Sequence, residues 1–330
     1  MGNILEIKNL SVKIPAHGGT VSAVRDVSLE LKKGETLAIV GESGCGKSML
    51  CKSIMKLLPE RAVIESGQII VNGTDITGLS DREMTKLRGQ LFSYVFQDPL
   101  SALDPTMTIG RQIAESILIH QRNLGKEEIL ARINELLTLV GIKNPEERSR
   151  LHSYELSGGM RQRCVLAIVL ASNPRILLAD EPTTALDVTI QAQILDLLKD
   201  IQKKRNMSTV LVSHDMGVVA RVADRVAIMY AGKIVETGTA EDIFYSPAHP
   251  YTQGLLKSLP INSRGKDVLE TIPGMPPSLM RLPKGDAFAC RNPKALPIDF
   301  IEEPPMFKIS DSHFAASWTL DKRYKNSNLE

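Results

Sequence analysis

The pattern of apolar and polar positions alternates between strand-like runs and helix-like stripes. Residues 37–40 and 176–179 are uninterrupted apolar runs, which are typical of strands buried on both faces. Residues 5–8 alternate apolar with polar side chains, as an edge or antiparallel strand does. Residues 187–204 instead carry one helical stripe, made of Ile190, Ile194, Leu197, Leu198 and Ile201. Because strands alternate with helices, the pattern predicts an α/β protein with a parallel sheet.

Two parts of the chain depart from this alternation. Residues 99–159 show no strand pattern but contain two amphipathic helix patterns, at 107–120 and 126–140. We therefore expect a helical subdomain, over about residues 98–163, inserted into a sheet domain that covers residues 1–240. Residues 241–330 hold 11 of the 18 prolines, which remove backbone donors and end helices. This last part is predicted to be a loop-rich C-terminal extension.

Composition excludes several classes of protein. The chain is 43% hydrophobic and 24% charged, as is ordinary for a globular protein. Its net charge is only +2 and its basic residues form no cluster, which argues against a nucleic-acid partner. The longest apolar run, residues 164–171, is much shorter than the roughly 18 residues of a membrane span. Residues 1–9 lack a signal-peptide pattern. We expect a cytoplasmic protein whose four cysteines are reduced and which reaches a membrane only through partners.

A phosphate-binding loop is predicted at residues 41–48, which match GxxxxGK[ST]. The motif lies between a buried strand and a helix expected at 49–58, so its amides can turn toward phosphate oxygens while Lys47 reaches the β- and γ-phosphates. The alternative is a glycine-rich turn with a chance lysine. Cys45, at a helix start beside Lys47, is expected to favour the thiolate. The predicted ATP-binding residues are Gly41, Ser43, Gly44, Cys45, Gly46, Lys47, Ser48 and Met49.

Two further motifs supply candidate chemistry. The buried strand at 176–179 ends in Asp180, suited to hold Mg²⁺, and Glu181, suited to face an attacking water. Taken alone, a strand followed by a polar turn would also explain them. Ser157 precedes two glycines at a predicted helix start, where it can serve as the N-cap and leave backbone N–H groups exposed. That start is a second anion-binding candidate, although a capped helix without a ligand has the same pattern.

Taken together, these motifs resemble those of the ABC ATPases. Residues 156–163 (LSGGMRQR) match the signature motif of that family. The other family motifs occur in the expected order, as the phosphate loop, Gln97 in the Q-loop, the signature, Asp180 and Glu181, the D-loop at 185–187 and the switch residue His214. The resemblance covers about residues 3–240. It implies a RecA-like P-loop NTPase fold with an antiparallel β-subdomain and an inserted helical subdomain.

The resemblance also implies roles for the motif residues. Two ATPase subunits would pair head to tail, so that the phosphate loop of one and the signature helix of the other hold the same ATP. Glu181 would polarise the attacking water, Gln97 would contact the γ-phosphate and His214 would support the transition state. The Mg²⁺ ligands would be Ser48, Gln97 and Asp180. The contacts to the partner's ATP would come from Ser157, Gly158, Gly159 and Gln162, with Asp187 in the D-loop.

The C-terminal part of the chain resembles that of one group within the ABC ATPases. Residues 246–256 (SPAHPYTQGLL), 273–277 (PGMPP) and 303–305 (EPP) resemble the extension of ATPase subunits from oligopeptide, dipeptide and nickel importers, and the overall match is to the D-type subunit. The implied partners are a second ATPase subunit of the F type, two transmembrane permease subunits and an extracytoplasmic substrate-binding protein. The chain would lie peripherally at the cytoplasmic face of the cell membrane. Nickel import, a DNA-acting ATPase and a soluble regulatory or ribosome-binding ABC protein are the alternatives.

The chain departs from the family pattern at the adenine-stacking position and at the cysteines of the extension. Residues 11–25 lack the aromatic side chain that usually stacks on adenine, and His17 is the only flat ring there. In many relatives four cysteines of the extension hold an iron–sulfur cluster. Only Cys290 is present in this extension, so we expect no such cluster, because these clusters need thiolate ligands. The residues aligned with the four cysteines are Asp286, Asn292, Asp299 and Ser317.

Overall fold

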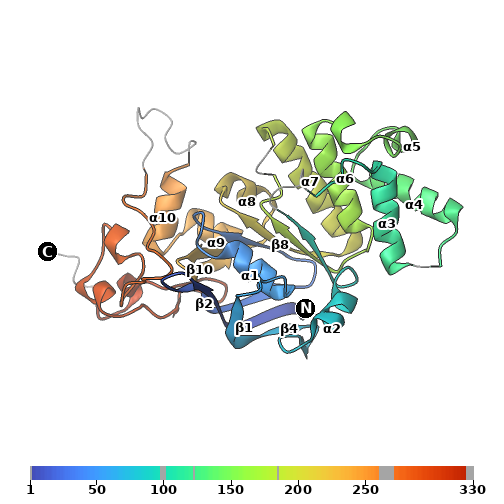
Figure 1. The fold of residues 1–330 in the computed structure, drawn as a ribbon. Helices are drawn as coiled ribbons and strands as arrows, with labels where there is room; N and C mark the ends of the chain where they lie inside the picture. Colours follow the sequence, from blue (N-terminus) through green and yellow to red (C-terminus); the bar gives the residue numbers. More distant parts are fainter. Residues whose placement is uncertain (1, 97–101, 122, 184–185, 260–270, 325–330) are drawn as a thin grey trace. The chain divides into compact units, whose positions relative to one another are not determined.

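The computed structural model describes residues 2–96, 102–121, 123–183, 186–259 and 271–324 (Figure 1). The chain forms two compact units. The first consists of residues 1–2, 32–35 and 78–211, and the second of residues 3–31, 36–77 and 212–330.

The second unit contains an antiparallel sheet in the order β2-β1-β4-β5 (Figure 1). Leu5 of β1 lies opposite Val71 of β4, and apolar residues such as Leu5 and Ile7 turn to the buried face. The alternation noted at residues 5–8 therefore belongs to a strand much longer than predicted. The bounds are β1 Asn3–Ala16, β2 Gly19–Lys32, β4 Val63–Val71 and β5 Thr74–Asp75. The antiparallel β-subdomain implied by the resemblance is confirmed.

A second group of strands in this unit runs in the order β11-β12-β10-β9-β3. β3 pairs with β9 in parallel, whereas β10 pairs with β9 and with β12 in an antiparallel manner. All residues of β3 are buried, as its apolar run predicts. The bounds are β3 Thr36–Val40, β9 Arg225–Tyr230, β10 Lys233–Thr239, β11 Phe307–Lys308 and β12 Phe314–Ala315.

The predicted extension shares the core of the second unit. Tyr251 and Phe288 pack in one apolar cluster with Val40, Ile228 and Tyr230 from the parallel strands. The extension also begins with two helices, so its first part is more regular than its proline content predicts. The helices of this unit are α1 Lys47–Ile54, α8 Met216–Val222, α9 Ala240–Tyr245 and α10 Pro250–Lys257.

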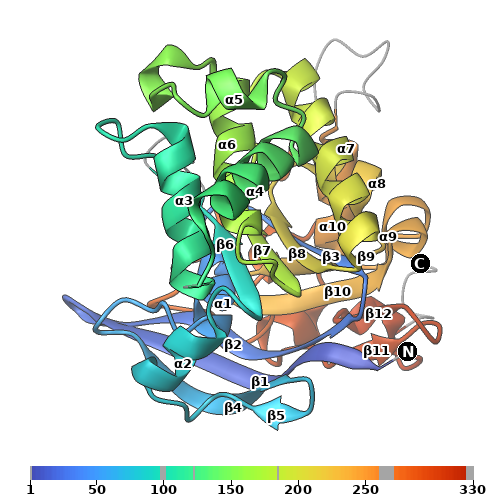
Figure 2. The same ribbon diagram turned by 90° about the vertical axis from the view of Figure 1, so that its right-hand side faces the viewer.

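The first unit places helices beside strands β6 and β7, which pair in parallel with Phe92 opposite Ile176 (Figure 2). β8 is next to β7 in the strand order, and its last two residues belong to the second unit. Helices α3, α4 and α6 pack against one another. The strands are β6 Phe92–Val95, β7 Ile176–Asp180 and β8 Ser208–Ser213. The helices are α2 Asp81–Leu87, α3 Ile109–His120, α4 Lys126–Leu139, α5 Pro145–Arg148, α6 Gly158–Leu170 and α7 Val188–Arg205.

The helical block matches its sequence pattern closely. The helices expected at 107–120 and 126–140 are α3 and α4, and Ile133, Leu136 and Leu137 of α4 form the buried stripe. Within the described part of residues 102–159, β-structure amounts to an isolated bridge between Thr108 and His152. The local periodicity was therefore sufficient to predict these helices.

Candidate functional site

The phosphate loop lies between β3 and α1 in the second unit, and close backbone contacts determine its path. A Cβ atom on Gly41 would lie 2.1 Å from the carbonyl oxygen of Met229. Gly46 has a φ of +111°, and its Cβ would lie 2.2 Å from the carbonyl oxygen of Ala23. Only glycine fits these two positions, because any side chain would have to displace backbone atoms.

The side chain of Lys47 folds back over the first residues of the phosphate loop. Its Nζ donates hydrogen bonds to the carbonyl oxygens of Gly41 at 2.8 Å and Glu42 at 3.0 Å, and the residue is buried. Helix α1 begins at Lys47, two residues earlier than predicted, so Lys47, Ser48 and Met49 form its first turn. The amides of a first helical turn lack partners within the helix and can donate to an anion.

The thiol of Cys45 does not behave as the sequence suggested. Its Sγ lies 3.8 Å from the Nζ of Lys47, a neighbour that favours the thiolate. Burial nevertheless raises the pKa of Cys45, because desolvation of the charged form outweighs the attraction of Lys47. The expectation of a thiolate at this position is therefore wrong. Burial also raises the pKa of Cys164, to about 12, while Cys290 is exposed.

His214 follows β8 in the second unit and is exposed. Its neighbours determine the local backbone, because the amide of Asp215 donates to Ser213 Oγ at 3.0 Å. Asp215 in turn caps α8, where its Oδ1 accepts a hydrogen bond from the amide of Gly217 at 2.7 Å. His214 thus lies between the end of β8 and the cap of α8.

In the first unit, Asp180 is the last residue of β7 and is buried. Its Oδ2 accepts a hydrogen bond from the hydroxyl of Tyr94 at 2.7 Å. Tyr94 lies on the paired strand β6, three positions before Gln97, and no sequence motif marks it as a site residue. Glu181 follows with a φ of +48°, an uncommon left-handed conformation for a non-glycine residue. Gln97 lies outside the described residues.

The signature motif forms the start of α6 as predicted. Ser157 is its N-cap, and its Oγ accepts a hydrogen bond from the amide of Met160 at 3.4 Å. A Cβ on Gly159 would lie 2.8 Å from Cγ2 of Ile190, so this glycine allows α6 to approach α7. Asp187 caps α7, with its Oδ1 accepting from the amide of Ile190 at 2.9 Å. The signature helix and the D-loop cap are therefore neighbours within one unit.

Gln162 connects α6 to the segment after Glu181. It is fully buried, and its Nε2 donates to the carbonyl oxygen of Pro182 at 2.6 Å. Its Oε1 is buried without a hydrogen-bond partner. Gln162 is predicted from the signature motif to contact the partner's ATP, whereas its amide group here holds the turn that follows Glu181.

The predicted site residues divide between the two units. The second unit holds the phosphate loop and His214, and the first holds Asp180, Glu181, the signature residues and Asp187. His17 is exposed in the turn between β1 and β2. A cavity of about 210 Å³ in the second unit is lined by Glu42, Ser43, Gly44, Cys45, Tyr230, Ala231, Pro276, Pro277 and Leu279.

The four positions aligned with cluster cysteines are all buried. The side-chain oxygens of Asp286, Asn292 and Asp299 accept hydrogen bonds from nearby backbone amides, such as that of Phe288 to Asp286 Oδ1 at 2.9 Å and that of Leu296 to Asp299 Oδ2 at 2.6 Å. The hydroxyl of Ser317 pairs with that of Thr319 at 2.9 Å. Burial raises the pKa of Asp286 to about 6 and also raises the pKa of Asp299. No group of three or more His, Cys, Asp or Glu side chains is arranged for a metal within the described ranges. The absence of an iron–sulfur cluster stays a prediction.

Known families match the two parts of the chain in turn. Residues 24–184 match the ABC transporter family, and residues 235–298 match the oligopeptide/dipeptide transporter C-terminal region. The chain is 54% identical over 319 residues to the oligopeptide transport ATP-binding protein OppD of Bacillus subtilis, covering 96% of this chain and 89% of the relative. It is 52% identical over 320 residues to the dipeptide transport ATP-binding protein DppD of Lactococcus lactis, covering 97% and 92%.

The fold is also that of a solved ABC ATPase. The ATP-binding cassette MJ0796, in a dimeric post-hydrolysis state with ADP and phosphate, aligns with a TM-score of 0.64 and 28% identity over 72% of this chain and 98% of its own. The molecule is thus an ABC-type ATPase. It belongs to the family of oligopeptide and dipeptide transport ATP-binding proteins. The predicted resemblance and fold class are confirmed. In the part of the chain that the structure describes, no helix has the length and apolarity to cross a membrane.

Proposed function

We propose that this chain is the ATP-hydrolysing subunit that powers a peptide importer. The observation that carries this proposal is the similarity to peptide transport proteins through the whole chain, including residues 235–298 of the extension. An ATPase domain shared with unrelated transporters would not need that extension. Oligopeptides or dipeptides are therefore the proposed cargo.

The nucleotide chemistry is assigned to residues of both units from the order of their motifs. Lys47 and the loop amides bind the β- and γ-phosphates, as in other phosphate loops. Ser48, Asp180 and Gln97 offer the oxygen donors that Mg²⁺ takes, and the buried carboxylate of Asp180 is oriented by Tyr94. We assign Glu181 as the group that polarises the attacking water. His214 then stabilises charge on the γ-phosphate.

The second half of each catalytic site is proposed to come from another subunit. Ser157, Gly158 and Gly159 offer the capped start of α6 to the nucleotide bound by the partner, and Asp187 lies at the next helix start. We propose that this partner is a distinct F-type ATPase subunit. Closure of the pair on ATP and reopening after hydrolysis would drive two permease subunits.

The helical block is the proposed docking surface for the permease subunits. Leu118 and Ile119 on α3 and Leu130 on α4 are large apolar side chains that remain exposed. Docking there holds the chain peripherally at the cytoplasmic face of the membrane, while a substrate-binding protein on the other side delivers the cargo. The proposed division is a nucleotide-binding domain over residues 1–240, with the helical subdomain at about 98–163, followed by the extension at 241–330.

Purification of the tagged chain from its native membranes in mild detergent tests the proposal. Two permease subunits and a second ATPase subunit should co-purify, and ATP hydrolysis by the complex in proteoliposomes should rise when a loaded binding protein is added. Peptides should stimulate and nickel chelates should not. Stimulation by nickel alone would assign the cargo to the metal importers, and stimulation by DNA without co-purifying permeases would contradict a transport role.

A further inference from the structure

Glu42, the second residue of the phosphate loop, is held by two residues of the C-terminal extension. The backbone N–H of Glu42 donates a hydrogen bond to the hydroxyl of Tyr251 at 2.9 Å. Its carboxylate accepts two hydrogen bonds from Arg291, at 2.6 Å from Nη1 and 2.8 Å from Nη2. Such a bidentate pair fixes orientation as well as distance. The extension therefore controls both the backbone and the side chain of one phosphate-loop residue.

Both residues that hold Glu42 are themselves rigidly placed. Tyr251 is fully buried and Arg291 is 5% exposed. The Nε of Arg291 donates to the carbonyl oxygen of Pro273 at 2.8 Å, and its Nη1 donates to the hydroxyl of Tyr230 at 3.2 Å. The guanidinium carbon lies 5.8 Å from the ring centre of Tyr230 and 5.9 Å from that of Phe288. A side chain fixed on this many sides can hold Glu42 without much further loss of entropy.

The charge of Glu42 gives this contact a consequence for nucleotide binding. A carboxylate inside a phosphate loop repels the phosphates that the loop is built to bind, and a partly buried setting strengthens that repulsion. Arg291 places a positive charge directly against it. The same carboxylate holds the pKa of Arg291 above its ordinary value, so the guanidinium stays charged.

We propose that Tyr251 and Arg291 are positioning residues for ATP binding. Tyr251 fixes the first turn of the phosphate loop, and Arg291 offsets the charge of Glu42 so that the loop accepts the anionic nucleotide. The extension is then part of the nucleotide site rather than an independent appendage. The inference rests on the nucleotide role proposed above for the phosphate loop.

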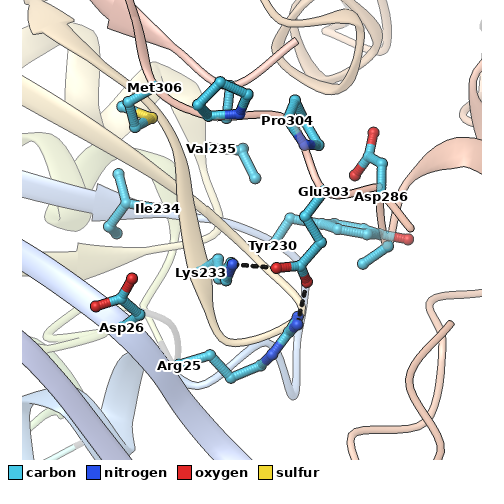
Figure 3. Close-up of a pocket in the computed structure, with 13 residues that line it drawn as sticks. Arg25, Asp26, Tyr230, Lys233, Ile234, Val235, Asp286, Glu303, Pro304 and Met306 are labelled. Atoms are coloured by element: carbon cyan, nitrogen blue, oxygen red, sulfur yellow. Dashed lines mark hydrogen bonds and ion pairs between the residues drawn. The ribbon is translucent and has the colours of Figure 1, made fainter. Parts of the chain in front are cut away.

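A second attachment of the extension provides a matched control. Glu303 points toward Arg25 of β2 and Lys233 of β10 and forms ion pairs with both (Figure 3). These three residues line a cavity of about 180 Å³, to which no phosphate-loop residue contributes. Substitution of Glu303 therefore loosens the extension without removing a direct contact to the phosphate loop.

The test compares ATP affinity across five variants of the full-length chain, by titration with Mg²⁺ and a fluorescent ATP analogue. Arg291→Met should raise the Kd about tenfold, because it leaves a loop carboxylate without its countercharge. Glu42→Gln in the Arg291→Met background should restore the Kd to within about threefold of wild type, since the neutral pair repels no phosphate. Tyr251→Phe should raise the Kd about threefold through the loss of one hydroxyl. Glu303→Gln should leave it within about twofold of wild type. Lys47→Ala serves as the reference for a disabled loop.

The outcomes separate three interpretations. A wild-type Kd in both Arg291→Met and Tyr251→Phe, with binding lost in Lys47→Ala, would overturn the inference and leave the nucleotide role intact. An equal rise in Arg291→Met and Glu303→Gln, or no recovery in the double variant, would also overturn it, because general loosening of the extension would then explain the effect. Wild-type binding by Lys47→Ala would instead refute the proposed role of the loop. If Arg291→Met fails to fold, the Kd values of Tyr251→Phe and Glu303→Gln are compared instead. A higher Kd in Tyr251→Phe alone supports the positioning role, and equal values overturn it.

Discussion

The chain has two helix starts that carry glycine-rich anion motifs, and their surroundings differ. At α1 Lys47 and Cys45 are buried and Gly41 lies against the backbone of Met229, whereas Ser43 and Gly44 are exposed. At α6 the cap residue Ser157 is exposed, and a Cβ on Gly158 would meet no atom within 4 Å. Both starts expose part of their glycine-rich segment, but only the first adds a buried lysine and a buried thiol.

This difference shows how the same local elements serve two purposes. Helix amides and glycines appear at both starts, but only α1 adds a buried lysine. A loop that adds a lysine to its helix amides can bind a phosphate chain by itself. An exposed helix start without a lysine offers weaker attraction and suits a phosphate that another molecule presents. Sequence motifs define the chemistry of each start, and the surrounding packing determines whether it acts alone.

The largest expected effect separates binding from hydrolysis. Glu181→Gln should leave ATP binding at the phosphate loop unchanged and slow hydrolysis by roughly two to four orders of magnitude, as loss of a general base does. The ATP-bound pair, in which both helix starts engage nucleotide, should then accumulate. Turnover is measured in the assembled transporter, and a wild-type rate there would exclude Glu181 from the proposed role.

The second prediction compares the two helix starts directly. Lys47→Ala should weaken ATP binding by the isolated chain by about 100-fold, because it removes a charge-assisted contact to phosphate. Ser157→Arg should leave that binding within about twofold. In the assembled transporter it should reduce ATP hydrolysis by roughly 100-fold, because a long side chain obstructs the open start.

Ser157→Thr provides the matched control, since threonine keeps the capping hydroxyl of α6. It should preserve most of the ATPase rate. If Ser157→Arg weakened ATP binding by the isolated chain as strongly as Lys47→Ala does, the distinction between a self-sufficient start and a dependent one would be wrong.

A third prediction concerns Asp286 in the C-terminal extension, whose pKa is raised to about 6 from 3.8 mainly by burial and further by Asp299 and Glu303. A carboxyl whose pKa is raised on folding costs stability above its folded pKa, and that cost disappears as the pH falls through 6 toward 3.8. Asp286→Asn keeps the acceptor for the amide of Phe288. It should therefore stabilise the chain by roughly 2 kcal/mol at pH 8, and the gain should vanish near pH 4.

Urea denaturation at both pH values measures this difference. Equal stability of the wild type and Asp286→Asn at pH 8, or a gain that increases on acidification, would show that the buried carboxyl carries no such cost.

The smallest effect is expected at Cys45, in a Cys290→Ser background that removes the exposed thiol. Because the pKa of Cys45 is raised by burial, a maleimide should label it slowly at pH 7, and faster as the pH increases. MgATP should slow the labelling several-fold further by covering the phosphate loop. Labelling indifferent to MgATP, followed by mass spectrometry, would mean that the thiol does not report on the nucleotide.

The sequence by itself determined the elements whose signals are local. The apolar run of β3, the stripe of α4 and the glycine–lysine spacing of residues 41–48 each encode their structure within about a dozen residues, so the α/β fold and the phosphate loop could be predicted. The cap role of Ser157 was predictable for the same reason. Strands β4 and β10 were not, because their patterns are weak and their positions depend on pairing with distant strands.

Only the tertiary structure decided contacts between residues distant in the chain. Tyr94 and Asp180 are hydrogen-bonded although they lie 86 positions apart. Glu42 is held by Tyr251, 209 positions away, and by Arg291, 249 positions away. No local pattern encodes such contacts, since they depend on how strands and the extension pack into a common core. The same reason applies to Cys45, whose motif favours a thiolate while the packed surroundings raise its pKa. Burial is a property of the whole fold, and it decides which chemistry a local motif can express.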